Sequence, residues 1–138
     1  MNERLSLSKK GRLWTITAFR LTARYICGLA VPVFNDRPDY QFEIGKGIRI
    51  REGTDVTLIA TGLCVSAALE AAKLLEQDGI SAEVVNIHTI KPLDQELILS
   101  CAIKTKKLVT IEEHSSVGGL GGAVCECCPV PAVPLEPR

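Results

Sequence analysis

The stretch VTLIATGLCVSAALEAAKLLEQDGISAEVVNI, residues 56–87, decides the fold of this chain. Residues 56–60 are rich in apolar side chains and predict a buried strand. Residues 64–77 predict a helix, which Gly79 ends in the left-handed conformation that glycine favours. Residues 82–87 predict a second core strand. The apolar residues expected on the inner face of the helix are Ala67, Ala68, Ala71, Ala72, Leu74 and Leu75.

The same alternation continues through a second helix and a third core strand. Pro92 stands just before Asp94, a residue type that caps helix N-termini, and Glu96 in the first turn suits the helix dipole. Residues 108–111 form the next apolar strand. Strand and helix therefore alternate from residue 56 onward, which predicts an α/β fold with a parallel sheet and right-handed crossovers. The expected inner face of this helix consists of Leu97, Ile98, Cys101 and Ala102.

The chain before this core is less regular. In residues 48–51 isoleucine and arginine alternate, as expected for an edge strand with one face open to solvent. Residues 31–39 carry two prolines and predict an extended linker. Residues 1–24 hold six basic side chains against one acidic side chain and have no assigned fold.

The composition limits the classes of protein to which the chain can belong. The chain has 138 residues, enough for one domain, and its 16 basic and 16 acidic residues cancel. This balance predicts neither a nucleic-acid partner nor a membrane surface. The chain also lacks an apolar run long enough for a membrane span, and its N-terminus lacks a secretory signal. We expect a cytoplasmic protein, although an acid-poor leader with arginine and serine is also found in transit peptides.

The segment LVTIEEHSSVGGLGGAV, residues 108–124, is the first candidate for a ligand site. Ligands of open α/β sheets bind beyond the carboxyl ends of the strands, and this segment runs from a strand into a glycine loop. The loop misses the dinucleotide fingerprint, because Val124 stands where the third glycine belongs. Free N–H groups at the start of the next helix could still hold an anion. The candidate anion or substrate contacts are His114, Gly118, Gly119 and Gly121.

The histidines and carboxylates of these loops can also be interpreted as residues with a structural role. His114 could carry a proton or bind phosphate, or it could hold the turn that redirects the chain. His88 ends the preceding strand and is expected to be structural. Glu112 and Glu113 are adjacent, so in extended backbone they point to opposite faces and cannot act as an acid/base pair. We therefore assign no catalytic residue, and Pro129 limits the helix after the loop to about two turns.

The six cysteines do not form a recognisable disulfide or metal framework. Cys27, Cys64 and Cys101 stand singly in apolar segments and are expected to be buried. The cluster of Cys125, Cys127 and Cys128 spells C-x-x-C once, but zinc would need a second pair of ligands. We expect no metal site and interpret the clustered thiols as reactive but incidental.

Four motifs in order give the chain a close resemblance to a known family. They are FEIGKGI (42–48), DVTLIATG (55–62), VNIHTIKPLD (85–94) and TIEEHSSVGGLGGAV (110–124). Together they resemble the C-terminal domain of transketolase, particularly the C-terminal subunit of split bacterial transketolases. The resemblance implies a three-layer, mostly parallel open sheet with helices on both faces and an antiparallel edge strand. It also implies a part in thiamine-diphosphate-dependent transfer of two-carbon ketol units between sugar phosphates.

In that family the cofactor and its divalent metal bind between other domains, and the C-terminal domain serves assembly. The resemblance therefore implies that this chain binds no cofactor alone. Its expected partner is an N-terminal or pyrimidine-binding transketolase subunit, and a homodimer is an alternative. A stand-alone interaction module and an anion-binding regulatory module are the rival interpretations.

The resemblance also divides the chain. We expect a basic segment at 1–24, a linker resembling the end of a pyrimidine-binding domain at 25–44, the transketolase C-terminal-like domain at 45–126 and a Pro-rich tail at 127–138. Family members usually carry an arginine for substrate phosphate in the region of residues 27–30, and this chain has none there. The last strand and helix of the family fold are missing as well, so we interpret the chain as a fragment.

Overall fold

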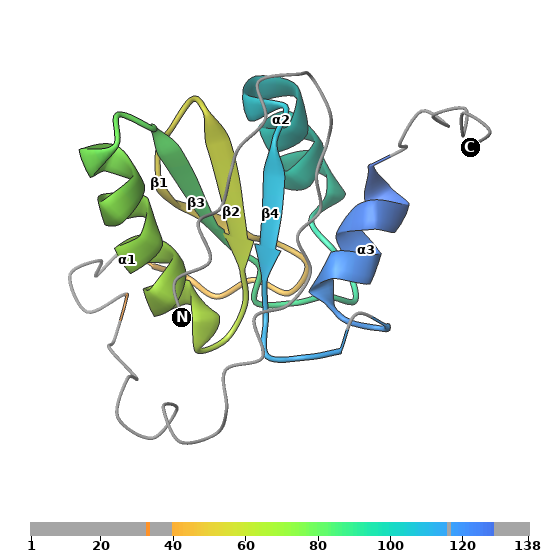
Figure 1. Ribbon diagram of the computed structural model, residues 1–138. Helices are drawn as coiled ribbons and strands as arrows, with labels where there is room; N and C mark the ends of the chain where they lie inside the picture. The colour runs from red at the N-terminus through yellow and green to blue at the C-terminus, as the bar shows by residue number, and fades with distance from the viewer. Residues whose placement is uncertain (1–32, 34–39, 116, 129–138) are drawn as a thin grey trace, which may run out of the picture.

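The computed structural model describes residues 33, 40–115 and 117–128. Predictions for the basic segment, for Cys27, for nearly all of the linker before residue 40 and for the tail beyond residue 128 lie outside this part. Strands and helices alternate through the described residues (Figure 1). The elements are β1 (Ile48–Arg51), β2 (Val56–Ala60), α1 (Cys64–Gln77), β3 (Ala82–Asn86), α2 (Gln95–Thr105), β4 (Leu108–Ile111) and α3 (Leu120–Cys127).

The strands form one mixed sheet in the order β1-β3-β2-β4. The strand β2 pairs in parallel with both β3 and β4, whereas β1 runs antiparallel to β3. Parallel neighbours need crossover connections, and here the helices α1 and α2 supply them. The predicted α/β fold, its parallel core and its antiparallel edge strand are therefore confirmed.

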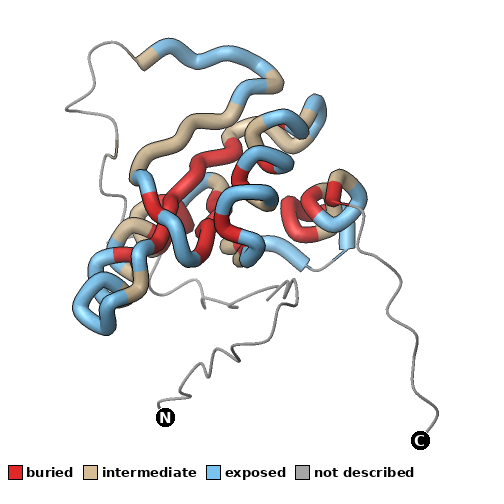
Figure 2. Tube along the Cα trace, turned by 90° about the horizontal axis from the view of Figure 1, so that it is seen from above, coloured by how far each residue is buried: buried red, intermediate tan, exposed pale blue. Residues whose placement is uncertain are grey.

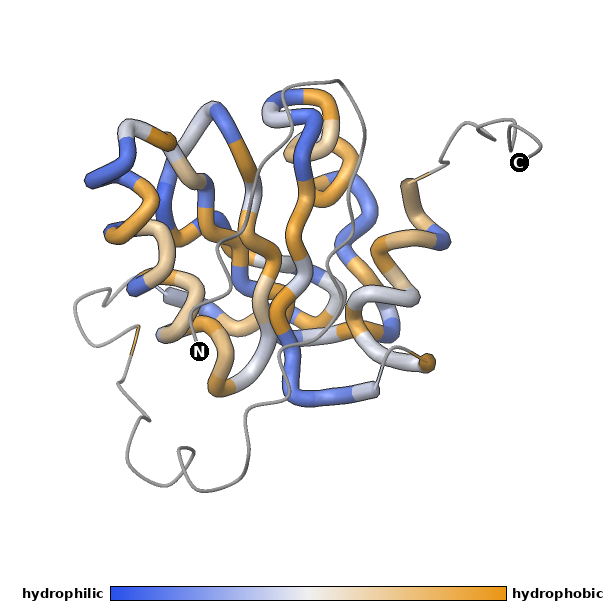
Figure 3. The backbone as a smooth tube through the Cα atoms, in the orientation of Figure 1, coloured by the Kyte–Doolittle hydropathy of each residue, from blue (hydrophilic) through white to orange (hydrophobic). Residues whose placement is uncertain are grey.

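The helices cover both faces of the sheet and bury two hydrophobic clusters (Figure 2). The cluster under α1 contains Leu58 and Ala60 of β2 together with Ala68 and Ala72 of the helix. The cluster on the opposite face joins Ile59 of β2 to residues of α2 and α3. The central strands are mostly hydrophobic along their length (Figure 3) because both of their faces are covered. These three layers match the architecture that the resemblance implies.

The helix ends follow the local signals in the sequence. Gly79 has φ +75°, and its N–H donates to the carbonyl of Glu76 at the end of α1. The Asp94 carboxylate accepts from the N–H of Leu97 at 3.1 Å and thereby caps α2. The helix α3 has 8 residues, as the two-turn prediction requires. One prediction was wrong: Leu74 is 62% exposed, because the buried stripe of α1 runs through Ala68 and Ala72.

The prediction of an open face on β1 was also wrong. All four residues of β1 are only partly exposed. Arg49 lies under α2, where its guanidinium reaches Glu83 of β3, and Arg51 pairs with Glu76 of α1 at 3.0 Å. Solvent access to the edge strand is therefore reduced on both faces, because its arginines bind carboxylates of the core and of α1.

A strap of residues 40–47 joins β1 to the loop between β3 and α2. The N–H of Gly45 donates to the Thr89 hydroxyl at 2.9 Å, and the N–H of Gly47 donates to the Asp94 carboxylate at 2.9 Å. Asp94 therefore serves two elements, since its other oxygen caps α2. Gly47 also leaves no room for a side chain, because a Cβ there would lie 2.5 Å from Cδ1 of Ile87.

Candidate functional site

The carboxyl ends of the parallel strands gather at one edge of the domain (Figure 1). The neighbouring strands β2 and β4 lead into helices on opposite faces of the sheet, α1 and α3. This arrangement makes a topological switch point, where open α/β sheets bind ligands. The N–H of Thr61 donates to the Ile111 carbonyl at 3.3 Å, which keeps the two strand ends together. The loop from Glu112 to Gly119 borders this point.

Glu112 is the buried polar centre of that loop. Its side chain is 2% exposed. Its two carboxylate oxygens accept from the N–H groups of Leu120 at 2.6 Å and Gly121 at 2.8 Å, in the first turn of α3. A carboxylate there satisfies N–H groups that the helix leaves without partners and suits the helix dipole. Glu112 therefore acts as the cap of α3, a role that Gly119 at the N-cap position cannot fill with a side chain.

The predicted contact residues lie in different environments. His114 and Gly118 are exposed, whereas Gly119 and Gly121 are buried. The N–H of Gly121, which the prediction offered to an anion, donates to Glu112. Among the residues that the structure describes, Glu112 is the charged side chain that binds this N–H group. The assignment of His114 and the glycines as anion contacts stays a prediction.

The adjacent carboxylates point apart, as expected for extended backbone. Glu112 is buried and Glu113 is exposed. Burial, aided by the negative charges of Glu113 and Glu112, raises the pKa of the Cys64 thiol at the start of α1. The start of α1, just after β2, therefore lies close to the carboxylates that follow β4. The two carboxylates thus lie in different environments, one buried and one exposed.

His88 has the structural role that the sequence suggests. Its Nε2 lies 3.0 Å from the carbonyl oxygen of Glu43 and forms a hydrogen bond with it. Its ring lies 4.6 Å from the ring of Phe42, measured between centroids. Both partners belong to the strap, so His88 holds residues 42–43 against the end of β3.

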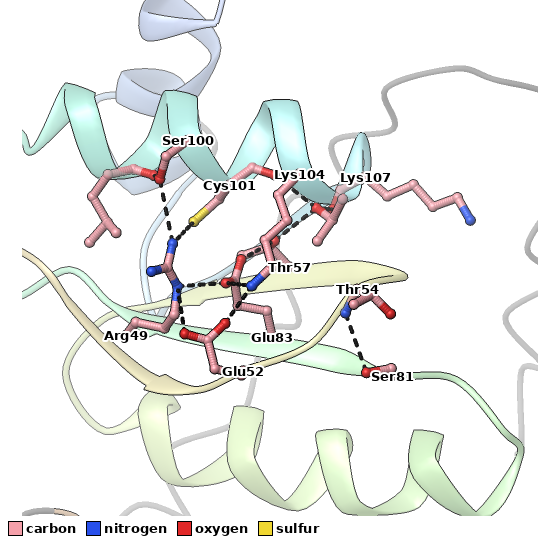
Figure 4. A network of polar contacts seen from close by, with 12 residues as sticks. Arg49, Glu52, Thr54, Thr57, Ser81, Glu83, Ser100, Cys101, Lys104 and Lys107 are labelled. Carbon is pink, nitrogen blue, oxygen red and sulfur yellow. Dashed lines mark hydrogen bonds and ion pairs between the residues drawn. The ribbon is translucent and has the colours of Figure 1, made fainter.

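A buried ionic cluster lies on the sheet face under α2, and no sequence signal pointed to it (Figure 4). Glu83 of β3 is fully buried, and its carboxylate lies 2.6 Å from Nε of Arg49 and 2.9 Å from Nζ of Lys104. The Thr57 hydroxyl donates to the same carboxylate at 2.8 Å. Glu52, which is exposed, contacts both cations from the outer side. We call these five residues the Glu83 cluster.

The Glu83 cluster keeps its central carboxylate charged. Burial alone would raise the pKa of Glu83, but hydrogen bonds from Lys104 and Thr57 and the charge of Arg49 hold this pKa below its usual range. The cluster joins β1, β3 and α2 far from the switch point. It therefore acts in packing and not at the candidate site.

The cysteines at the end of α3 differ in exposure. Cys125 is exposed, whereas Cys128 is 5% exposed and belongs to the core cluster under α2 and α3. Burial and the neighbouring thiols raise the pKa of Cys128 to about 11, and burial raises the pKa of Cys127. The thiolate is the reactive form, so burial disfavours reaction at these two residues, and the reactivity of the cluster stays a prediction.

Two kinds of feature are absent from the described ranges. No set of three or more histidine, cysteine, aspartate or glutamate side chains there could hold a metal ion. None of the helices in the described part of the chain is long and apolar enough to cross a membrane.

The alternating elements, the antiparallel edge strand and the capped glycine loop define a class of open-sheet α/β domain. The sequence model described as "Transketolase, C-terminal domain" matches residues 45–130. The chain therefore belongs to the transketolase C-terminal domain family. The match takes in every helix and strand of the described fold.

Individual relatives agree with this assignment. A 6-deoxy-6-sulfo-D-fructose transketolase subunit of Clostridium sp. (strain MSTE9) is 50% identical over 100 residues, which cover 70% of this chain and 31% of that protein. A 1-deoxy-D-xylulose-5-phosphate synthase of Heliobacterium modesticaldum is 46% identical over 106 residues, or 77% of this chain and 16% of the synthase. The chain thus spans about a third or less of the length of the curated relatives it matches.

A solved structure gives the same result. A split-gene transketolase, described as an inactive β4 tetramer, superposes with a TM-score of 0.64 and 51% sequence identity. The superposition covers 65% of this chain and 30% of the other. Fold and sequence therefore point to the same part of the transketolase architecture.

Proposed function

We propose that this domain serves the assembly of a transketolase-type enzyme and has no activity alone. The enzyme would transfer two-carbon ketol units between sugar phosphates with thiamine diphosphate as cofactor. The observation that carries the proposal is the match to the family's C-terminal domain in relatives that are named as transketolase subunits. We also propose a cytoplasmic location and a place in the pentose phosphate pathway, both of which follow from the family.

The described residues do not fit thiamine diphosphate or its divalent metal. They contain no acidic or histidine cluster that could hold the metal. The N–H groups of Leu120 and Gly121, which suit a diphosphate by position, already donate to Glu112. When bound, the cofactor would supply the carbanion chemistry, and we assign its binding to the partner domains.

Exposed apolar side chains at the carboxyl edge support a docking role. Phe42 and Ile44 lie on the strap, Leu63 follows β2, and Val117 lies in the loop after β4. Their exposed fractions are 59%, 68%, 44% and 81%. A contiguous apolar patch is typical of an interaction surface, and we propose that these four residues, which follow or flank the carboxyl ends of the strands, form one. We call these four residues the edge patch.

The proposed occupant of the edge patch is the pyrimidine-binding domain of the enzyme. In the family this domain precedes the C-terminal domain, and the chain enters the fold through the strap, beside Phe42 and Ile44. A second copy of this chain is the alternative occupant.

Ile44→Asp tests the proposed docking surface. A charge in the patch should weaken binding to a separately expressed transketolase subunit that carries the pyrimidine-binding domain. The matched control is Ile103→Asp, because Ile103 is 77% exposed on α2 and lies outside the patch. Biolayer interferometry would measure both variants. Equal binding by Ile44→Asp and the control would contradict the proposed surface.

A further inference from the structure

In the glycine loop before α3, the position of a bound anion is filled by a side chain of the same chain, Glu112. Both oxygens of the Glu112 carboxylate accept N–H groups of the first turn, at 2.6 and 2.8 Å. The two residues are Leu120 and Gly121, the positions at which a phosphate would bind a helix start. Glu112 is 2% exposed, so the carboxylate is also shielded from solvent.

Two neighbouring glycines of this loop are required for different reasons. Gly118 has φ +77°, a conformation that side chains disfavour, but a Cβ there would meet nothing within 4 Å. Gly119 has φ −96° and ψ −167°, which any residue adopts. A Cβ on Gly119, however, would overlap the Glu112 carboxylate, with Oε1 and Cδ both at 2.8 Å and Oε2 closer still. Gly119 is therefore a glycine because Glu112 occupies its side-chain space.

We infer that the glycine loop is shaped to hold the carboxylate of Glu112, and that this carboxylate excludes free phosphate from the start of α3. A tethered group competes at an effective concentration of roughly millimolar or above, which is hard for a free anion to match. The glycines of a phosphate loop allow the approach of a ligand, and here they allow the approach of the chain's own anion. The inference does not depend on the proposed assembly role.

A double-mutant cycle tests the steric part of this inference. Gly119→Ala should raise the equilibrium constant for unfolding by roughly tenfold to a hundredfold, because the carboxylate must leave two buried N–H groups. In the Glu112→Ala background the same change should raise it only a few-fold, since the clash is gone. Urea denaturation followed by circular dichroism would measure all four proteins.

Gly118→Ala is the matched control for the cycle. Its effect comes from backbone strain. The factor by which it changes the equilibrium constant for unfolding should therefore agree within about twofold between the two backgrounds. In the contrary result, Gly119→Ala changes the unfolding constant by the same factor with and without Glu112, just as Gly118→Ala does. The carboxylate would then not be the reason why residue 119 is glycine.

A titration of the unmodified chain tests the exclusion of phosphate and does not depend on how the variants fold. Inorganic phosphate would be added to ¹⁵N-labelled protein while the amide signals of Leu120 and Gly121 are followed. We expect no saturable shift at millimolar phosphate. A saturable shift of these two signals would overturn the inference, because the anion would then bind beside the Glu112 carboxylate or displace it.

Discussion

Replacing Glu83 by glutamine should destabilise the domain strongly at neutral pH. The change removes the charge that Arg49 and Lys104 share at 2.6 and 2.9 Å but keeps the size of the side chain. Breaking a buried ion pair typically costs 3–5 kcal/mol. Because the side chains of Arg49 and Lys104 are 30% and 34% exposed, water can partly replace the lost contact. We therefore expect a loss near the lower limit, about 3 kcal/mol.

Glu52→Gln is the matched control for this experiment. Glu52 contacts the same two cations, but its side chain is 70% exposed, and exposed ion pairs contribute little to stability. Urea denaturation at pH 7 would measure the free energy of unfolding of both variants. If the two variants lost equal stability, burial would not be what makes Glu83 important.

The pH dependence of Glu83→Gln has a definite sign. Since the pKa of Glu83 is held below its usual range in the folded state, its charge stabilises the fold above the unfolded pKa of about 4.3. This stabilisation is lost as the pH falls through the lower, folded pKa. The difference between the wild-type protein and Glu83→Gln should therefore shrink in acid. A difference that stays constant down to the acid transition would refute the reasoning.

Three further predictions concern single residues. Asp94→Ala should lower the free energy of unfolding by about 1–3 kcal/mol, since α2 loses its cap and Gly47 loses its partner; an unchanged midpoint in urea would contradict this double role. Gly79→Ala should cost about 1 kcal/mol because φ is +75°, and thermal unfolding would show it; an increase in stability would mean that the left-handed conformation is not kept. Iodoacetamide at neutral pH should label exposed Cys125 well before buried Cys128, whose pKa is about 11; mass spectrometry of peptides would detect the reverse order.

Much of the fold could be predicted because its signals are local. The limits of α1 follow from apolar periodicity and from Gly79, and the start of α2 follows from Asp94. The alternation of these elements then implies the parallel sheet. In each case the deciding interaction lies within a few residues along the chain, where capping and periodicity act.

The Glu83 cluster could not be predicted because its contacts are long-range. Arg49 and Glu83 belong to strands that pair only in the folded sheet, and Lys104 comes from a helix that follows both. In sequence, Glu83 stands between Ala82 and Val84 with no nearby charge to mark it. The sequence of β1 therefore predicts a face open to solvent, whereas the Arg49 side chain on that face is held by Glu83 and contacts α2.

The assignment of His114 and the glycines as anion contacts stays a prediction, but the structure shows what the sequence left open at the start of α3. The glycine loop indicated an anion at the start of α3, and the structure places a carboxylate there. That carboxylate belongs to Glu112, eight positions before Leu120. Sequence alone could not separate a glycine needed for room, Gly119, from one needed for a positive φ, Gly118.

Sedimentation velocity of mixtures tests the proposed assembly role most directly. The full chain would be mixed with a transketolase subunit that carries the diphosphate- and pyrimidine-binding domains, and each protein would also be run alone. The proposal predicts a new, faster-sedimenting species that contains both proteins, while the chain alone shows no calorimetric binding of thiamine diphosphate. Independent sedimentation of the two proteins, together with submicromolar binding of thiamine diphosphate by the chain alone, would contradict it.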